Sequence, residues 1–285
     1  DMKRLVNAII GTDRLAPAAS RAAPAAARAL DPSPVLSLSD VSNDRLSAVD
    51  LSVMQGEIHG LAGLIGSGRT EILETIFGLR PVERGAFEIE GRPWLPNGPA
   101  DAIERGVALV PEDRHVQGLV LDHSIERNIT LPRIPHFSRW GFLQQRAAIR
   151  RAEAAVARLS VKAQGASSLV RTLSGGNQQK VVFGKWNDTR PRVLLLDEPT
   201  VGVDVGAREE IYGVIRNAAR DGSGVLVVSS DLVELIELCD RISVIVDGRV
   251  ARTLKRGEIV DAEELHHLLQ IYQATGQGEL QELPA

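Results

Sequence analysis

The sequence predicts an α/β fold in which a parallel sheet carries the functional loops. An antiparallel β subdomain precedes this sheet, and a helical subdomain is inserted into it. Apolar strands and helices alternate along residues 193–246, as a parallel sheet requires. A glycine-rich loop at 63–70 joins a short apolar strand to the start of a helix. Apolar and polar residues alternate along 35–60, which indicates antiparallel strands around that first strand.

The sequence, taken segment by segment, predicts the strands and helices in chain order. The expected strands and helices are strand Ile58–Ala62, a helix start at Glu71–Phe77, a strand pair in 86–96, strand Val107–Val110, helix Gln144–Leu159, strand Val193–Leu196, helix Ala207–Arg220, strand Gly224–Ser229, helix Leu232–Cys239 and strand Ile242–Val246. Asp247-Gly248 is a hairpin turn signal. The aromatic residues Phe137, Trp140 and Phe142 either pack within the helical subdomain or form a docking spot.

The domain organisation follows from changes in composition. Residues 1–14 form a short amphipathic piece, and 15–34 are rich in alanine with four prolines, which is typical of a linker. Residues 35–255 form the main domain, with the helical subdomain at about 121–180, and 256–285 add a short helix and a polar tail. Because the chain begins with Asp1 rather than Met, we expect a piece of a longer protein.

Composition excludes several classes of function. The chain has 285 residues, 44% hydrophobic and 25% charged, which is typical of a globular domain. A formal net charge of -4 argues against nucleic-acid binding, which favours a basic face. The single cysteine, Cys239, excludes an internal disulfide framework and lies in an apolar setting that favours a core role. No signal peptide and no run of 18 apolar residues is visible.

The glycine-rich loop matches a phosphate-binding motif except at one position. Its letters, G-L-I-G-S-G-R-T, fit G-x-x-x-x-G-K-[ST] with Arg69 in place of lysine. Glycines let backbone N–H groups point at phosphate, and Thr70 keeps the hydroxyl that ligates Mg²⁺. The predicted nucleotide-binding residues here are Gly63, Gly66, Ser67, Gly68, Arg69, Thr70 and Glu71. The alternative is a plain glycine turn between a strand and a helix.

A second anion site is predicted in the segment Leu173–Lys180, L-S-G-G-N-Q-Q-K. Ser174 is a natural N-cap, and Gly175 and Gly176 leave the backbone open to close approach. This helix start is suited to the γ-phosphate of a nucleotide that another surface holds, and Gln178 belongs to the same predicted site. A flexible loop is the alternative interpretation.

A pair of carboxylates follows the strand Val193–Leu196. Because α/β sheets place ligands at the carboxyl ends of their strands, Asp197 is predicted to hold Mg²⁺. Glu198 is predicted to orient or deprotonate the attacking water. The alternative is a solvated turn.

Together these segments resemble the nucleotide-binding domain of ABC transporters, which has a P-loop NTPase (RecA-like) core. Val110–Arg114, Leu173–Lys180 and Asp197–Gly206 narrow the resemblance to the second half of tandem ATPases in sugar importers of the ribose, galactose and xylose type. The resemblance covers about Pro34 to Gly248.

The resemblance assigns roles to three further residues. It places Glu112 at the Q-loop glutamine, which touches Mg²⁺ and couples to the membrane subunit. Asp204 matches the D-loop aspartate that reaches across a dimer, and Ser230 replaces the switch histidine at the γ-phosphate. No aromatic residue precedes Phe77, so the usual adenine-stacking side chain is absent.

The resemblance also implies a function. ATP and Mg²⁺ would lie between this half and a first ATPase half of the same polypeptide, with transmembrane permease subunits and, indirectly, a sugar-binding protein as partners. The location would be the cytoplasmic side of the bacterial membrane, and the isolated chain would hydrolyse ATP weakly or not at all. The alternatives are a non-transport ABC protein acting on ribosomes or DNA, and a non-hydrolysing regulatory domain.

Overall fold

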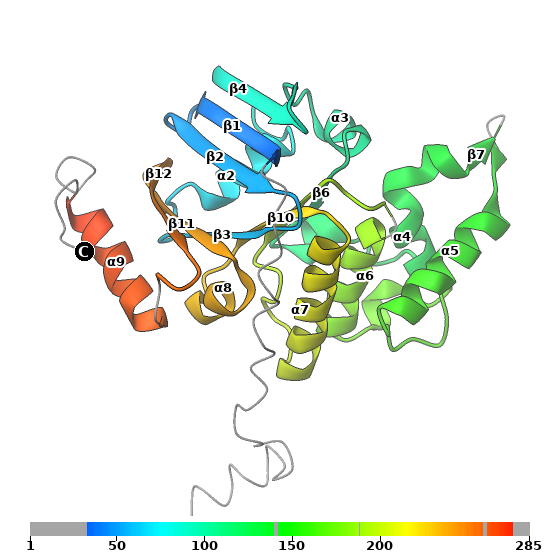
Figure 1. Cartoon of the computed structure of the whole chain (residues 1–285). Coiled ribbons are helices and arrows are strands. Elements are labelled where there is room, and N and C mark those ends of the chain that lie inside the picture. The colour runs from blue at the N-terminus through cyan, green and yellow to red at the C-terminus, as the bar shows by residue number, and fades with distance from the viewer. Residues whose placement is uncertain (1–32, 140–141, 188, 259–260, 276–285) are drawn as a thin grey trace, which may run out of the picture. The chain divides into compact units, whose positions relative to one another are not determined.

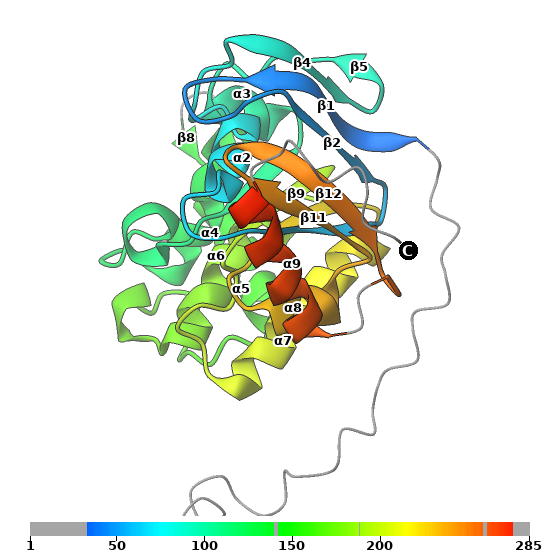
Figure 2. The ribbon, with the colours of Figure 1, turned by 90° about the vertical axis from the view of Figure 1, so that its left-hand side faces the viewer.

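The structure is a computed structural model that describes residues 33–139, 142–187, 189–258 and 261–275 (Figures 1 and 2). The predictions for residues 1–14, for nearly all of the linker 15–34, for Trp140 and for the tail after 275 therefore lie outside the described residues.

A six-stranded sheet forms the centre of the described domain. Its order is β12 (Arg249–Lys255), β11 (Arg241–Val246), β3 (Ile58–Ala62), β10 (Gly224–Val228), β9 (Val193–Asp197) and β6 (Val107–Val110). All neighbours pair in parallel except the edge strand β12, which returns antiparallel beside β11. Every residue of β3, β9 and β10 is buried, as expected for strands covered on both faces.

A separate antiparallel sheet is formed by strands that come before and after β3 in the sequence. Its order is β2 (Val49–Met54), β1 (Pro34–Ser42), β4 (Arg84–Ile89) and β5 (Arg92–Pro93). The alternating pattern predicted these strands correctly, but they pair with one another and not with β3. Their sheet instead reaches the central one where β2 contacts β10 and β12.

Helices cover both faces of the central sheet. They are α2 (Arg69–Ile76), α3 (Pro99–Glu104), α4 (Ile125–Thr130), α5 (Gln145–Arg158), α6 (Gly175–Asn187), α7 (Val205–Arg220), α8 (Leu232–Leu238) and α9 (Ala262–Thr275). Helix α2 lies between the two sheets, and α7 and α8 lie on the opposite face of the central sheet (Figures 1 and 2).

The inserted helical subdomain is built mainly from α4, α5 and α6, which contact one another pairwise. Between them lie the π-helical turn η1 (Arg114–Gly118), the 3-10 segments η2 (Leu131–Phe137) and η3 (Val170–Thr172), and a small hairpin of β7 (Ser138–Arg139) and β8 (Phe142–Leu143). Phe137 is buried beneath the Arg151 guanidinium, whereas Phe142 is exposed. The two described aromatic residues thus take different surroundings.

Most predicted elements are found within one or two residues of their expected bounds, and three differences have local causes. Helix α2 begins at Arg69 rather than Glu71, because Gly68 at φ 106° forms its N-cap. Helix α8 ends at Leu238, and Cys239 is a buried residue in extended backbone. Asp247 and Gly248 both have positive φ and form the predicted hairpin turn, which leads into β12.

Candidate functional site

The glycine-rich loop lies between β3 and α2, at the carboxyl end of the central sheet. Gly66 and Gly68 have φ of 80° and 106°, which L side chains rarely adopt. A Cβ at Gly63 would lie 2.4 Å from Ser67 Oγ, so the loop closes tightly on itself. Within the described part of the chain, this Ser67 hydroxyl is buried with no hydrogen-bond partner. Such an orphaned polar atom fits a loop that receives phosphate oxygens.

Arg69 does not extend into solvent but lies across the end of the sheet. Its side chain is 8% exposed, and Nη1 donates a hydrogen bond of 2.9 Å to the carbonyl oxygen of Ser229 at the end of β10. Burial lowers the pKa of Arg69, while the carboxylates of Glu198, Asp197, Glu112 and Glu71 raise it. The guanidinium is therefore the cation that faces this acidic cluster.

Asp197 ends β9 and meets the first turn of α2. The hydroxyl of Thr70 donates to Asp197 Oδ1 over 3.2 Å, so the predicted pair of Mg²⁺ ligands is brought together. Burial, followed by the nearby charges of Glu112 and Glu198, raises the pKa of Asp197 to about 7, and the Thr70 hydrogen bond lowers it. Desolvation has this effect because it disfavours a charged carboxylate.

Glu198 follows in a strained conformation. Its φ is 47°, uncommon for a residue with a side chain, and its backbone N–H donates to Val228 O at 2.9 Å. Ser230 Oγ donates to Glu198 Oε2 over 3.1 Å. Burial raises the pKa of Glu198, whereas the hydrogen bonds from Ser230 lower it. The residue at the switch position thus holds the carboxylate predicted to handle water.

The donor set fits Mg²⁺ held in its usual way. No group of three or more His, Cys, Asp or Glu residues in the described ranges could hold a metal by itself. Mg²⁺ commonly binds one or two carboxylates together with substrate phosphates and water, so a cage of protein ligands is not required. Thr70 and Asp197 supply suitable oxygens, and Glu112 is an exposed carboxylate two residues beyond β6.

The segment Leu173–Lys180, which we call the signature segment, leads into α6 of the helical subdomain. Ser174 immediately precedes α6, is exposed, and accepts a backbone hydrogen bond from Gln178 at 2.9 Å. Its hydroxyl accepts a hydrogen bond of 2.8 Å from Asn177 Nδ2. A Cβ at Gly176 would lie 2.7 Å from Ala207 Cβ, so the helix start packs closely on α7. The N-terminus of α6 remains accessible beside Ser174.

Two other predicted site residues have structural contacts of their own. Gln178 is buried, with Oε1 2.9 Å from His115 Nε2 and Nε2 donating to Val170 O at 3.3 Å. Asp204 is exposed and caps α7 by accepting from the Ala207 N–H at 3.0 Å.

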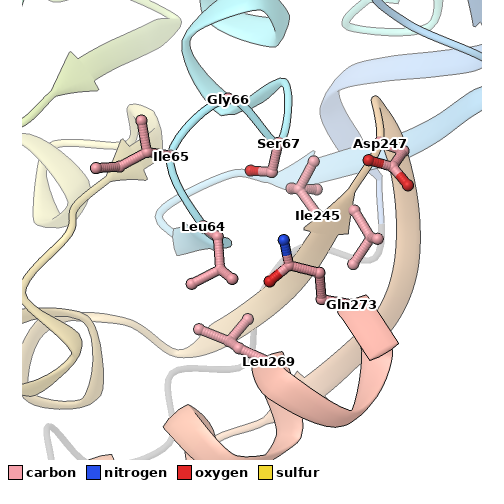
Figure 3. A pocket seen from close by; sticks show the side chains of 9 residues that line it. Leu64, Ile65, Gly66, Ser67, Ile245, Asp247, Leu269 and Gln273 are labelled. Atoms are coloured by element: carbon pink, nitrogen blue, oxygen red, sulfur yellow. The ribbon is translucent and has the colours of Figure 1, made fainter. Parts of the chain in front are cut away.

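Helix α9 lies beside the phosphate-binding loop. This contact was not predicted from the sequence. A small pocket of about 50 Å³ lies beside the loop, and Figure 3 shows side chains of α9 facing it. The lining residues are Leu64, Ile65, Gly66, Ser67, Ile245, Val246, Asp247, Leu269 and Gln273. Leu265, Leu269 and Tyr272 are buried, and this apolar spacing was the available sequence signal that α9 packs on the domain.

The fold and this geometry define a nucleotide-binding α/β domain of the P-loop type. A family model described as ABC transporter matches residues 46–201. The chain therefore belongs to the ABC transporter family. Within the described residues, none of the helices combines the length and apolarity needed to cross a membrane.

Curated relatives carry one recurring name. The ribose import ATP-binding protein RbsA of Geobacillus kaustophilus is 46% identical over 207 residues, covering 73% of this chain and 42% of that protein. Its namesake in Chelativorans sp. is 49% identical over 218 residues, covering 76% and 43%. The chain thus spans less than half the length of these relatives.

Solved structures share the fold. One described as the ATP binding subunit of an ABC transporter gives a TM-score of 0.67 at 24% identity, covering 83% of this chain and 99% of that chain. A nucleotide-free ATP-binding cassette from an ABC transporter gives 0.68 at 18% identity, covering 83% and 95%. The P-loop NTPase fold expected from the sequence is confirmed.

Proposed function

We propose that this chain is the second half of a tandem ATPase that drives import of a monosaccharide. It would offer the N-terminus of α6 to ATP held on the P-loop of the first half. The single observation that carries this proposal is the contrast between an accessible Ser174 and a buried Arg69 that is bonded within its own domain. The length of the RbsA relatives and their name, ribose import ATP-binding protein, support the tandem arrangement and the substrate class.

The composite site would use the physics of a helix start. Backbone N–H groups of the first turn and the helix dipole favour a phosphate group there. Ser174, Gly175 and Gly176 would contact the γ-phosphate, and the exposed Asp204 would face the first half. Gln178 would act by holding η1 and η3 against α6, as its hydrogen bonds to His115 and Val170 indicate.

The site on this chain's own P-loop would bind nucleotide with little turnover. Thr70 and Asp197 would hold Mg²⁺, which would neutralise phosphate charge when bound. Glu198 would accept a proton from water, but its carboxylate is bonded by Ser230, which the proposed assignment puts where a histidine is usual. Arg69 faces the same carboxylates, so phosphate binding requires this planar guanidinium to leave Ser229. A regulatory, non-hydrolysing role for this P-loop is therefore part of the proposal.

The proposed partners follow from the same assignment. Closing two halves around ATP would move the transmembrane permease subunits on the cytoplasmic side of a bacterial membrane, and a sugar-binding protein would deliver the solute. The helical subdomain, which carries α6, would transmit the closure.

Substitution of Ser174 tests the proposal in the tandem protein. Ser174→Arg places a long cation at the helix start, where it should block phosphate approach and lower ATPase activity roughly 100-fold. The matched control is Ser167→Arg, at an exposed serine in the same subdomain, which should retain wild-type activity. A phosphate-release assay measures both. Wild-type activity in Ser174→Arg would show that this helix does not serve a composite site.

A further inference from the structure

Three side chains from three different elements hold the loop that follows Glu198. Gln179 of α6 donates to Pro199 O at 2.9 Å, and Thr200 donates to Glu234 Oε1 of α8 at 2.7 Å. Arg114 of η1 donates from Nη1 to Val201 O at 2.8 Å and from Nη2 to Gly202 O at 3.4 Å. The loop at 199–204 is therefore hydrogen-bonded to α6, to α8 and to η1.

Arg114 has a special place among the three because it also touches the start of α6. A Cβ at Gly175 would lie 3.0 Å from Arg114 Nη2, and a Cβ at Gly202 would lie 3.3 Å from the same atom. The guanidinium thus lies against two glycines, one in the signature segment and one in the D-loop. Gly175 and Gly202 are 27 positions apart in the sequence. One planar cation, the Arg114 guanidinium, lies against both.

The segment that carries Arg114 is itself well fixed. Asp113 Oδ1 accepts from the N–H groups of His115 and Val116, at 2.9 and 3.1 Å, and so caps η1. His115 lies 2.9 Å from Gln178 of α6. Glu112, the Q-loop position, directly precedes this cap. The segment after Glu112 is therefore joined to the signature helix through hydrogen-bonding partners at Asp113 and His115.

We propose that Arg114 is a positioning residue that sets Ser174 and Asp204 in register for a nucleotide on the facing half. This inference rests on the proposed function, because only a composite site needs both residues at once. A bidentate arrangement of two N–H donors fixes position and orientation, which a lysine ammonium cannot reproduce. Arg114 lies outside the residues predicted to contact nucleotide on this chain's own P-loop, so its removal should leave binding there unchanged.

The test compares Arg114→Lys and Arg114→Ala with wild type in the tandem protein. Loss of register should lower kcat for MgATP by roughly 100-fold in Arg114→Ala and about tenfold in Arg114→Lys, with KM changed far less. The matched control is Arg192→Ala, because Arg192 also donates to a backbone carbonyl, Arg105 O, at 2.9 Å but faces Glu90. That control should keep the wild-type kcat.

Two further measurements separate a positioning role from a folding role. Arg114→Lys should have the melting temperature of wild type, and binding of a fluorescent ATP analogue to the purified chain should be unchanged. A wild-type kcat in Arg114→Lys and Arg114→Ala overturns the proposal, as does a lowered kcat that is matched by Arg192→Ala. If Ser174→Arg leaves activity intact, the proposed composite site is wrong. If only the Arg114 variants leave activity intact, the positioning role of Arg114 alone is wrong.

Discussion

The P-loop end of the central sheet and the N-terminus of α6 differ in how their polar groups are bonded. At the P-loop, Arg69 bonds to Ser229, Thr70 to Asp197 and Ser230 to Glu198. At α6, Ser174 is exposed at the helix start. At the P-loop the Ser67 hydroxyl is left without a partner among the described residues, whereas at α6 the Ser174 hydroxyl accepts from Asn177 and the proposed function uses the backbone N–H groups of the first turn. On the proposed function, the contrast means that one domain of the family can keep its contribution to a neighbour while its own site turns over little.

The two regions also differ in the ionisable side chains that are buried near them. Strand β3, which leads into the P-loop, carries buried His59 beside Arg241, and Arg241 pairs with Glu57 over 2.9 Å. Within α6 itself, the ammonium of buried Lys185 donates to Gly118 O, and burial lowers the pKa of Lys185 to about 8. Both regions therefore hide ionisable groups, but those groups titrate in different pH ranges.

The largest expected effect comes from a methyl group at the signature. In Gly176→Ala the new Cβ would lie 2.7 Å from Ala207 Cβ, so α6 and α7 must separate. Because ångström shifts misplace catalytic groups, ATPase activity of the tandem protein should fall roughly 100-fold. The control is Gly213→Ala in α7, where nothing lies within 4 Å and helix propensity should raise stability by up to about 1 kcal/mol. If Gly176→Ala and Gly213→Ala have the same ATPase activity, close packing of α6 on α7 is not needed for activity.

Acidification should act through the strand beneath the P-loop. Burial, followed by the charge of Arg241, lowers the pKa of His59 to about 3, while its contact with Ser52 raises it. The unfolded chain binds a proton below about pH 6.5 and the folded chain does not, so stability is lost as pH falls from there toward 3. Between pH 7.5 and 5 the contribution of His59 to the free energy of unfolding should drop by about 2 kcal/mol, while protonation of Asp197, whose folded pKa is raised to about 7, acts in the opposite direction over the same range.

Urea denaturation of the wild-type chain and of His59→Gln at the two pH values measures this contribution as the difference between them. His59→Gln keeps polar atoms near Ser52 and Ser243 but cannot titrate, so its pH dependence should be smaller by the same amount. An unchanged pH slope in this variant would assign the acid sensitivity to other groups.

Local patterns were enough to predict the elements and the loops that carry the site. The all-apolar strands β9 and β10 and the glycines of residues 63–68 specify their conformations through nearby sequence alone. Glu198 and Asp197 were placed correctly at a strand end, because a buried apolar run followed by carboxylates leaves few alternatives.

Contacts between distant residues could not be predicted in this way. Arg69 meets Ser229 across 160 positions, and Arg114 meets Val201 across 87. Each pairing depends on which strands are neighbours in the central sheet and on how η1 turns. The π-helical form of η1 also gives no periodic signal, since it spans only Arg114–Gly118. Thus the sequence identified Arg69 as unusual, while its hydrogen bond to Ser229 O required the structure.

A smaller effect is expected when the P-loop regains its lysine. Lys in Arg69→Lys is a compact charge that can reach phosphate without a fixed contact to Ser229 O, so MgATP should bind the purified chain about tenfold more tightly. Titration calorimetry measures the affinity, with Arg92→Lys as the control at an exposed arginine.

The same preparation tests turnover at this chain's own P-loop. Phosphate release by the wild-type chain should stay well below the roughly 1 s⁻¹ at the low end of typical enzymes. Faster turnover, or an affinity that is the same in both Arg69→Lys and wild type, would mean that Arg69 does not limit this site.

The smallest expected effect tests most directly whether the two regions differ in their contribution to ATP hydrolysis. Glu198 belongs to the P-loop side, where Ser230 donates to its carboxylate and where, on the proposed assignment, Ser230 and Arg69 replace a histidine and a lysine. If ATP is hydrolysed mainly on the first half, Glu198→Gln in the tandem protein should lower ATPase activity less than about twofold, or 0.4 kcal/mol. The control is Glu209→Gln at an exposed position of α7. A loss comparable to that of Ser174→Arg would place hydrolysis on this chain, because a carboxylate that only stabilises structure would not affect turnover alone.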